Sequence, residues 1–228
     1  MTTIKTLAAY EVVQHEFPRP PPTEKDEIGR ATGKAIDHAL SQWSHQHRQN
    51  LRPTAASVQR TAKEVLDEEL RDADVVMTVE QRSSAERQIA GVLQAFRKSP
   101  VFGLARPRSR MVLVNGEVGV YAQPDYWDGG QAFYEMKAYR AVPPPPDVAL
   151  QVRIFQLAFP GMRSFLACFD RHHDPVETVL FEVPPATADE RSSLLTLLLR
   201  VGRELGHEKV LEYVDVQKLA YSVSVAQG

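Results

Sequence analysis

The chain has 228 residues and a mass of 25.6 kDa, with 43% hydrophobic and 25% charged residues. A chain of this length buries roughly 70% of its surface on folding, and the composition excludes a disordered or collagen-like protein. The formal net charge of −2 excludes a polycation that binds nucleic acid over its whole surface. The single cysteine, Cys168, excludes a disulfide framework and a four-cysteine iron–sulfur cluster.

The beginning of the chain, MTTIKTLAAYEVVQHEFP, lacks a basic start followed by an apolar run, and no stretch reaches the ~20 apolar residues of a membrane span. We therefore expect a cytoplasmic protein without a membrane partner, in a reducing compartment. Proline-rich segments at 18–22 and 143–146 do not separate two cores. We expect a single domain over residues 1–228, with its core at about 27–205.

The first hundred residues are predicted to be mostly helical. Ile36, Leu40 and Trp43 recur at helical spacing within a helix predicted over residues 27–44. Apolar residues recur at the same three- and four-residue steps between 53 and 98, which predicts further helices.

Three short runs of β-branched and aromatic residues follow, separated by Asn-Gly and Asp-Gly-Gly turns: 111–114, 118–127 and 132–138. They predict a β-meander. The remaining elements are an almost wholly apolar helix, two strands and a leucine-rich helix preceded by a capping box at Thr187: 147–159, 164–170, 177–183 and 194–205. This order predicts an α/β fold with a central mixed sheet flanked by helices.

Two acids and a lysine share the predicted hairpin after residue 123: Asp125, Glu135 and Lys137. Glu135 and Lys137 project from one face, because side chains alternate along a strand. With a two-residue loop at 129–130, Asp125 would lie opposite Tyr134 and face away from Glu135. We expect the three-residue loop 128–130, a common hairpin type, which pairs Asp125 with Phe133 and places all three groups on one face.

A pair of carboxylates supplies the oxygen ligands that Mg²⁺ or Mn²⁺ prefers. Such a metal lowers the pKa of a bound water and neutralises phosphate charge, and the Lys137 ammonium can stabilise the developing negative charge. An isolated Glu-x-Lys is more often a solvated surface pair, but here apolar runs and a Pro-Asp pair surround it.

The pattern Pro124-Asp125, nine residues, Glu135-x-Lys137 resembles the core of the PD-(D/E)XK nucleases, in the branch of the RecB-type exonuclease domains and their CRISPR-associated relatives. The resemblance covers about residues 27–205. It implies a restriction-endonuclease-like fold and a Mg²⁺- or Mn²⁺-dependent DNA nuclease in which Asp125, Glu135 and Lys137 are catalytic. The iron–sulfur cluster of some relatives is excluded, because Cys168 is alone.

The family also carries a glutamine on the helix that follows this strand, with a tyrosine four residues later. Gln151 matches the glutamine, and Phe155 replaces the tyrosine. The resemblance implies that Gln151 positions water or DNA, whereas a satisfied core amide is the alternative from the residue alone.

An early helix in the family carries a glycine and, four residues later, a metal-binding histidine. Here Gly33 is followed by Asp37 at that spacing, and His38 comes one residue late. On a helical wheel Asp37 flanks the buried direction and His38 points nearly opposite to it. We favour Asp37 as the third acidic ligand or a group beside the metal, with a simple surface acid as the alternative.

The segment 97–110 contains five basic residues and no acid, and is a candidate phosphate track. The DNA-binding candidates are Arg106, Arg108, Arg110 and Tyr139, although solvated loop residues are the simpler interpretation. Aromatic residues around the acidic pair could stack the bases of a single strand or pack the sheet.

The resulting hypothesis is a metal-dependent DNA exonuclease acting on linear ends, single- or double-stranded, in DNA repair, recombination or phage and defence DNA processing, with a helicase or recombination protein as a partner. The competing hypothesis is a catalytically weak or inactive nuclease-fold subunit that binds DNA through partners. The sequence does not distinguish an RNA substrate from a DNA substrate, because it identifies no residue that would recognise the 2′-hydroxyl group.

Overall fold

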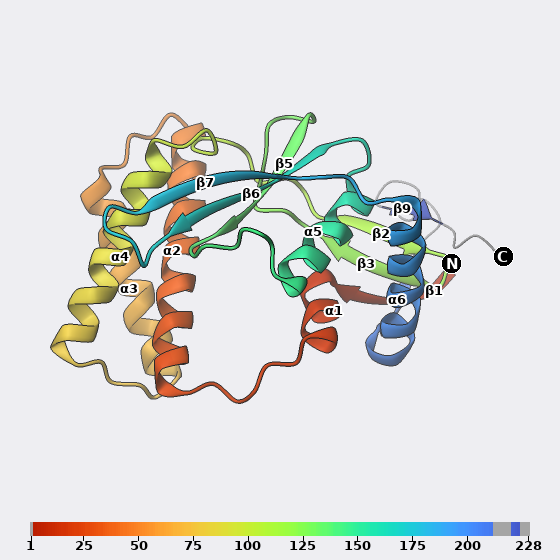
Figure 1. The fold of residues 1–228 in the computed structure, drawn as a ribbon, viewed down its shortest axis with the longest axis horizontal. Coiled ribbons are helices and arrows are strands. Elements are labelled where there is room, and N and C mark those ends of the chain that lie inside the picture. The colour runs from red at the N-terminus through yellow and green to blue at the C-terminus, as the bar shows by residue number, and fades with distance from the viewer. Residues whose placement is uncertain (1, 212–219, 224–228) are drawn as a thin grey trace.

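The computed structural model describes residues 2–211 and 220–223 of the chain, and it is an α/β structure with helices packed around two mixed sheets (Figure 1). The helices are α1 (Ala9–Glu16), α2 (Glu24–Arg48), α3 (Ala55–Asp72), α4 (Val79–Arg97), α5 (Pro146–Ala158) and α6 (Ala188–Leu205). The strands are β1 (Thr2–Ala8), β2 (Arg110–Val114), β3 (Val118–Ala122), β4 (Tyr126–Trp127), β5 (Ala132–Lys137), β6 (Arg163–Asp170), β7 (Glu177–Val183), β8 (His207–Leu211) and β9 (Ala220–Val223).

The helices α2, α3 and α4 form a bundle at one end of the molecule (Figure 1). Each starts at a threonine whose side chain accepts a hydrogen bond from a backbone N–H of the first turn: Thr23, Thr54 and Thr78. Ile36 and Leu40 are fully buried in the core that the bundle shares with the second sheet, which confirms the predicted helical stretches.

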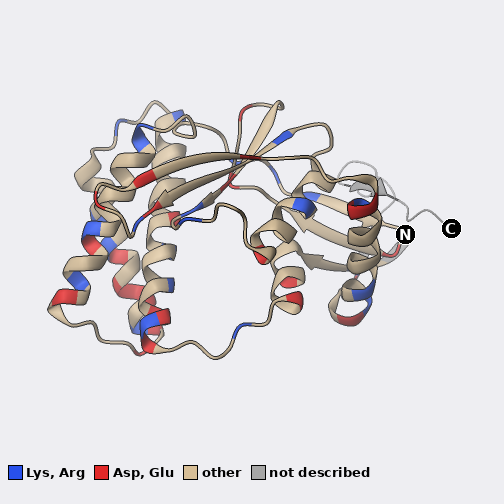
Figure 2. Ribbon diagram, viewed as in Figure 1, with Lys and Arg blue, Asp and Glu red and all other residues tan. Residues whose placement is uncertain are grey.

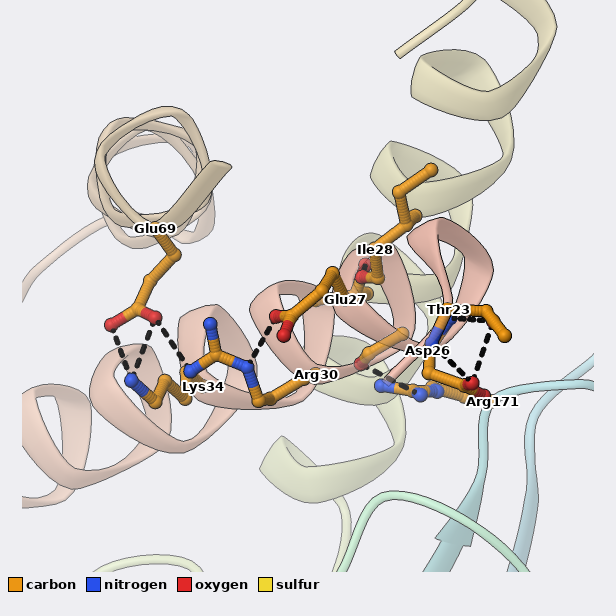
Figure 3. Close-up of polar contacts among 10 residues, drawn as sticks. Thr23, Asp26, Glu27, Ile28, Arg30, Lys34, Glu69 and Arg171 are labelled. Carbon is orange, nitrogen blue, oxygen red and sulfur yellow. Dashed lines mark hydrogen bonds and ion pairs between the residues drawn. The ribbon is translucent and has the colours of Figure 1, made fainter. Parts of the chain in front are cut away.

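The outer surfaces of the bundle carry both signs of charge, so this region is not a basic face (Figure 2). In Figure 3, Lys34 and Arg30 of α2 both reach Glu69 of α3, with the Lys34 Nζ 2.7 Å from a carboxylate oxygen. These exposed ion pairs each contribute little to stability. The apolar contacts therefore dominate the packing of α2 on α3.

The four-stranded sheet, in the order β4-β5-β6-β7, lies between the bundle and α5. Its strand β5 runs parallel to β6, and successive side chains of β5 enter opposite cores. Met136 packs toward the bundle, whereas Phe133 packs toward α5. Cys168 of β6 is buried beside α5, as expected for a small core residue.

The five-stranded sheet, in the order β8-β1-β3-β2-β9, is covered on one face by α1, α5 and α6. The predicted hairpin of β2 and β3 is present. The expected third strand is not continuous with it, because the chain leaves this sheet after Ala122 and forms β4 and β5 in the other one. The single central sheet of the prediction is thus divided into two.

The strand β1 and the helix α1 were absent from the prediction. β1 pairs in parallel with β3, and Leu7 and Val12 are buried in the core around α5. The folded core therefore begins well before residue 27. Within the described residues, the helices are all too short or too polar to cross a membrane.

Candidate active site

The hairpin that carries the predicted acids has a different register from the one expected. Tyr126 pairs with Tyr134, and Trp127 pairs with Phe133 rather than with Gln131. The observed strand pairing is therefore shifted by two residues from the expected one. Because a shift of two preserves the alternation of side chains, Asp125 still belongs to the face of Glu135, as predicted.

The physical reason for the different register lies in Asp128. Its carboxylate accepts hydrogen bonds from the backbone N–H groups of Gln131 and Ala132, at 2.9 and 2.8 Å. This turn, closed by the side chain, makes 129–131 the three-residue loop in place of 128–130. Aspartate commonly closes turns in this way, so its presence before the two glycines was the overlooked signal.

Asp125 lies just before β4 and reaches across to β5. Its Oδ2 accepts a hydrogen bond of 2.8 Å from the backbone N–H of Met136, the residue after Glu135. This bond fixes the carboxylate of Asp125 beside that of Glu135. The structure therefore brings the two predicted acids together.

Lys137 connects the acids to α5. Its Nζ donates to Oε1 of Glu135 at 2.7 Å and to Oε1 of Gln151 at 3.0 Å. Gln151 therefore bonds to the central lysine and is not a core amide satisfied within its own helix. Phe155, one turn later, is buried against the ring of Phe133 and takes no part in this network.

The carboxylate of Glu135 is buried, with the residue only 4% exposed. Burial, followed by the negative charge of Asp125, raises the pKa of Glu135 to about 8, against the opposing effect of Lys137. Burial alone would lower the pKa of Lys137, but Glu135 outweighs it and holds that pKa above its usual range. The lysine thus remains a cation beside two closely spaced acids.

Asp37 on α2 belongs to the same electrostatic neighbourhood. Partial desolvation, followed by the charge of Asp125, raises the pKa of Asp37, but the residue is exposed, so solvent weakens both effects. The positive charges of Lys137, Arg106 and Arg171 act in the opposite direction. His38, the alternative ligand, is exposed as the helical wheel predicts.

Arg171, which sequence reasoning missed, holds α2 near these groups. It follows the last residue of β6, and its Nη2 donates a hydrogen bond of 3.0 Å to the carbonyl oxygen of Gly29 (Figure 3). A Cβ atom at Gly33 would lie 3.4 Å from its Nη1, an ordinary van der Waals contact, so Arg171 packs directly on this face of α2. Gly29 and Gly33 lie one turn apart on that face.

Asp125 and Glu135 fit a divalent cation by the chemistry of their donor atoms. Lys137 occupies Oε1 of Glu135 and the Met136 amide occupies Oδ2 of Asp125, which leaves Asp125 Oδ1 and Glu135 Oε2 outside those bonds. Hard oxygen donors suit Mg²⁺ or Mn²⁺, and a cation relieves the repulsion that raises the pKa of Glu135. In the described residues, no three His, Cys, Asp or Glu side chains converge closely enough to hold a metal, so Asp37 does not complete a three-ligand cluster.

The four predicted DNA-binding residues lie in different surroundings. Arg106 is exposed and acts electrostatically on Asp37. The guanidinium of Arg110 lies 4.6 Å from the ring centre of Phe159, so this side chain also packs on the protein. Arg108 is exposed on the same segment, and Tyr139 is 37% exposed two residues after Lys137.

A cleft of about 690 Å³ opens beside Lys137. Its floor includes Lys137, Tyr139 and Gln151. The other walls come from α1, from the segment that joins α1 to α2 and from the first turn of α5: Tyr10, Val13, Gln14, Phe17, Pro18, Arg19, Pro20, Pro21, Pro22, Asp147 and Val148. The sequence analysis considered the prolines of residues 18–22 only as a possible domain boundary, so it did not predict that they line a cleft.

Comparisons with known proteins give little further information. No family model and no curated protein matches the chain. Among solved structures, a crystal structure from Eubacterium rectale named "Putative exonuclease" is similar in fold, with a TM-score of 0.48 and 10% sequence identity over 94% of this chain and 87% of that one. A likeness at this level bears on neither the substrate nor the roles of the residues.

Proposed function

We propose that the protein is a metal-dependent DNA nuclease whose site consists of Asp125, Glu135, Lys137 and Gln151. The observation that carries the proposal is the convergence of two adjacent carboxylates, a buried lysine and a helix amide at the edge of one cleft. An isolated surface Glu–Lys pair would have neither this burial nor these partners. The proposal includes the RecB-like exonuclease assignment that the sequence resemblance implies.

In this proposal Asp125 and Glu135 hold Mg²⁺ or Mn²⁺, with Asp37 adding negative charge nearby. The bound cation supplies Lewis acidity, which lowers the pKa of water and offsets the charge of the phosphate. In the hydrolysis itself, a water oxygen forms a bond to phosphorus, the bond to the leaving sugar oxygen breaks, and that oxygen takes up a proton.

The chain's own contribution is positioning and charge. The hydrogen bonds from Lys137 to Glu135 and Gln151 fix its ammonium in one place, so it needs no reorganisation when negative charge develops on the phosphate. Gln151 orients the lysine from α5. The Met136 amide keeps the Asp125 carboxylate aimed at the same region.

The test is digestion of end-labelled single- and double-stranded linear DNA, with covalently closed circles beside them, in Mg²⁺, Mn²⁺ or EDTA. Wild type, Asp125→Asn and Lys137→Ala are compared with Lys34→Ala. Lys34 is a matched control, because it also pairs with a glutamate, but on the exposed side of α2 (Figure 3). We expect metal-dependent loss of linear DNA that the first two substitutions reduce at least 100-fold and that Lys34→Ala leaves unchanged.

Two observations favour the second candidate, a nuclease-fold subunit that binds DNA without cutting it. Asp37 does not join the other acids in a metal-holding cluster of the described residues, and a buried phenylalanine stands at position 155. Intact DNA in every metal, together with a band shift that Lys137→Ala preserves, would support this candidate and overturn the nuclease. The covalently closed circular DNA distinguishes the two modes of cleavage, because it has no ends and is cut only by an enzyme that cleaves internally.

A further inference from the structure

Exposed aromatic side chains are concentrated at the cleft beside Lys137. Among residues 4–209, whose side chains the structure describes, three aromatic residues are more than a third exposed: Tyr10 at 57%, Phe17 at 37% and Tyr139 at 37%. All three line this one cleft. A scattered exposed aromatic needs no explanation, but the convergence of all three indicates a binding surface.

The local structure of α1 explains how two of these rings reach the cleft. Tyr10, Val13, Gln14 and Phe17 follow the three- and four-residue spacing of one helix face, and all four line the cleft. The opposite face carries Val12, which is fully buried in the core. The helix is therefore anchored on one side and presents its aromatic side chains to the cleft on the other.

Residues 17–22, which we call the strap, line the same cleft as Lys137 and Gln151. The strap contains four prolines, which restrict its backbone. Its one charged residue, Arg19, places Nη2 3.3 Å from Oδ2 of Asp147 at the start of α5. This pair joins the strap to the helix that also carries Gln151, and because Arg19 is 82% exposed it contributes little to stability.

We propose that Tyr10, Phe17 and Tyr139 form a stacking subsite for unpaired nucleotide bases, next to the cleavage site and walled by the strap. The inference rests on the proposed function and names which residues select the form of the substrate. A cleft of about 690 Å³ is within the 300–1,000 Å³ range of small-ligand sites, which is room for a few bases of one strand. Aromatic faces stack any base, and Arg19 and Lys137 supply positive charge for the backbone.

The first experiment measures binding in EDTA, where no cleavage occurs, by the anisotropy of a labelled dT oligonucleotide and of a blunt, closed-end hairpin duplex. We expect the double substitution Tyr10→Ala and Phe17→Ala to weaken binding of the single strand at least tenfold, since one base–aromatic stack is worth about 1–3 kcal/mol. Tyr10→Phe should restore wild-type binding at that position. Leu180→Ala, a matched loss of an exposed apolar side chain on β7, should change nothing.

The second experiment reports ring contact directly. A dT oligonucleotide that carries 5-iodouracil is irradiated with the protein, and the cross-linked residue is mapped by mass spectrometry. Cross-links at Tyr10, Phe17 or Tyr139 are expected. Cross-links confined to other aromatic residues would overturn the subsite, as would equal weakening of single-strand and duplex binding by the double substitution.

The two proposals fail in different ways. If Lys137→Ala abolishes cleavage while the double substitution changes neither single-strand affinity nor the KM for single strands, the nuclease stands and the subsite is wrong. If wild type cuts nothing but single-strand binding depends on Tyr10 and Phe17, the subsite stands without catalysis. Absence of binding to either nucleic acid, for instance because the cleft takes a peptide, overturns the subsite.

Discussion

The ammonium of Lys137 lies 2.7 Å from Oε1 of Glu135, two residues earlier in the same strand, although burial drives that carboxyl toward its neutral form. A second acid, Asp125, is fixed beside Glu135 by the Met136 amide. A buried acid beside a second acid is costly for folding. In the proposed function, a divalent cation held by the two acids offsets this cost.

Removal of the Lys137 ammonium should destabilise the protein. Lys137→Ala removes the donor that hydrogen-bonds to the buried carboxyl of Glu135, so we expect the free energy of unfolding to fall by about 1–3 kcal/mol. Lys34→Ala, which breaks an exposed pair, should change it by less than about 0.5 kcal/mol. Urea unfolding at pH 7 in EDTA measures both, and equal effects would contradict the buried pair.

Stability without metal should decrease as the pH rises. The folded-state pKa of Glu135, about 8, lies above its unfolded value of 4.5, whereas solvent screens the exposed Asp37, whose pKa is raised in the same direction. Between pH 4 and 8 the folded state therefore binds more protons than the unfolded state, and the free energy of unfolding decreases with pH. We expect the free energy of unfolding to decrease by at most a few kcal/mol over this range. Urea unfolding in EDTA at a series of pH values measures the decrease.

Glu135→Gln tests the origin of this slope. The substitution removes the buried group with the raised pKa, so most of the decrease between pH 5 and 8 should disappear, because solvent screens the exposed Asp37. Asp26→Asn, at an exposed helix cap, provides the comparison, because hydrogen bonds from Thr23 lower the pKa of Asp26 instead. An unchanged slope in Glu135→Gln would refute the assignment.

A divalent cation should stabilise the protein and remove this pH dependence. A cation that binds the folded state alone, at 100 times its dissociation constant, adds about 2.7 kcal/mol. It replaces the proton on Glu135, so the gain in melting temperature should increase from pH 6 to 8. Thermal unfolding with Mg²⁺, Mn²⁺ or EDTA measures the gain, and Asp125→Asn should remove it. A gain that persists in Asp125→Asn would place the cation elsewhere.

Local patterns predicted much of the fold and of the candidate site. The α/β class, the buried face of α2 around Ile36 and the capping box of Thr187 with Glu190 are all confirmed. These features depend on residues close together in the chain. The shared face of Asp125 and Glu135 also follows from strand alternation, even though the turn differs by one residue from the prediction.

The remaining features depend on contacts between distant segments. β1 is stabilised by pairing with β3 more than a hundred residues later, so its own short sequence did not identify it. Arg171 meets Gly29 across 142 residues, and the cleft forms only when the strap passes opposite α5. The single domain and the catalytic roles of the site residues stay predictions.

Arg171→Met should separate stability from electrostatics. The Nε and Nη1 atoms of Arg171 are buried without hydrogen-bond partners in the described structure, so their removal offsets the loss of the Nη2 bond to Gly29. We expect the free energy of unfolding to change by less than about 1 kcal/mol. The guanidinium also lowers the pKa of Asp37, so the substitution should raise that pKa, as measured by carboxyl ¹³C titration. An unchanged Asp37 titration would contradict their coupling.

Asp37→His should change the choice of metal if Asp37 reaches the cation. Imidazole favours Mn²⁺ over Mg²⁺ more than a carboxylate does, so the ratio of cleavage rates in Mn²⁺ and Mg²⁺ should increase at least several-fold. Asp37→Asn is the control for loss of charge alone and should lower both rates together. His38→Ala should leave the ratio unchanged, because this neighbouring side chain is exposed on the face that the helical wheel places away from the core. If His38→Ala alters the ratio and Asp37→His does not, the residue that completes the site is His38.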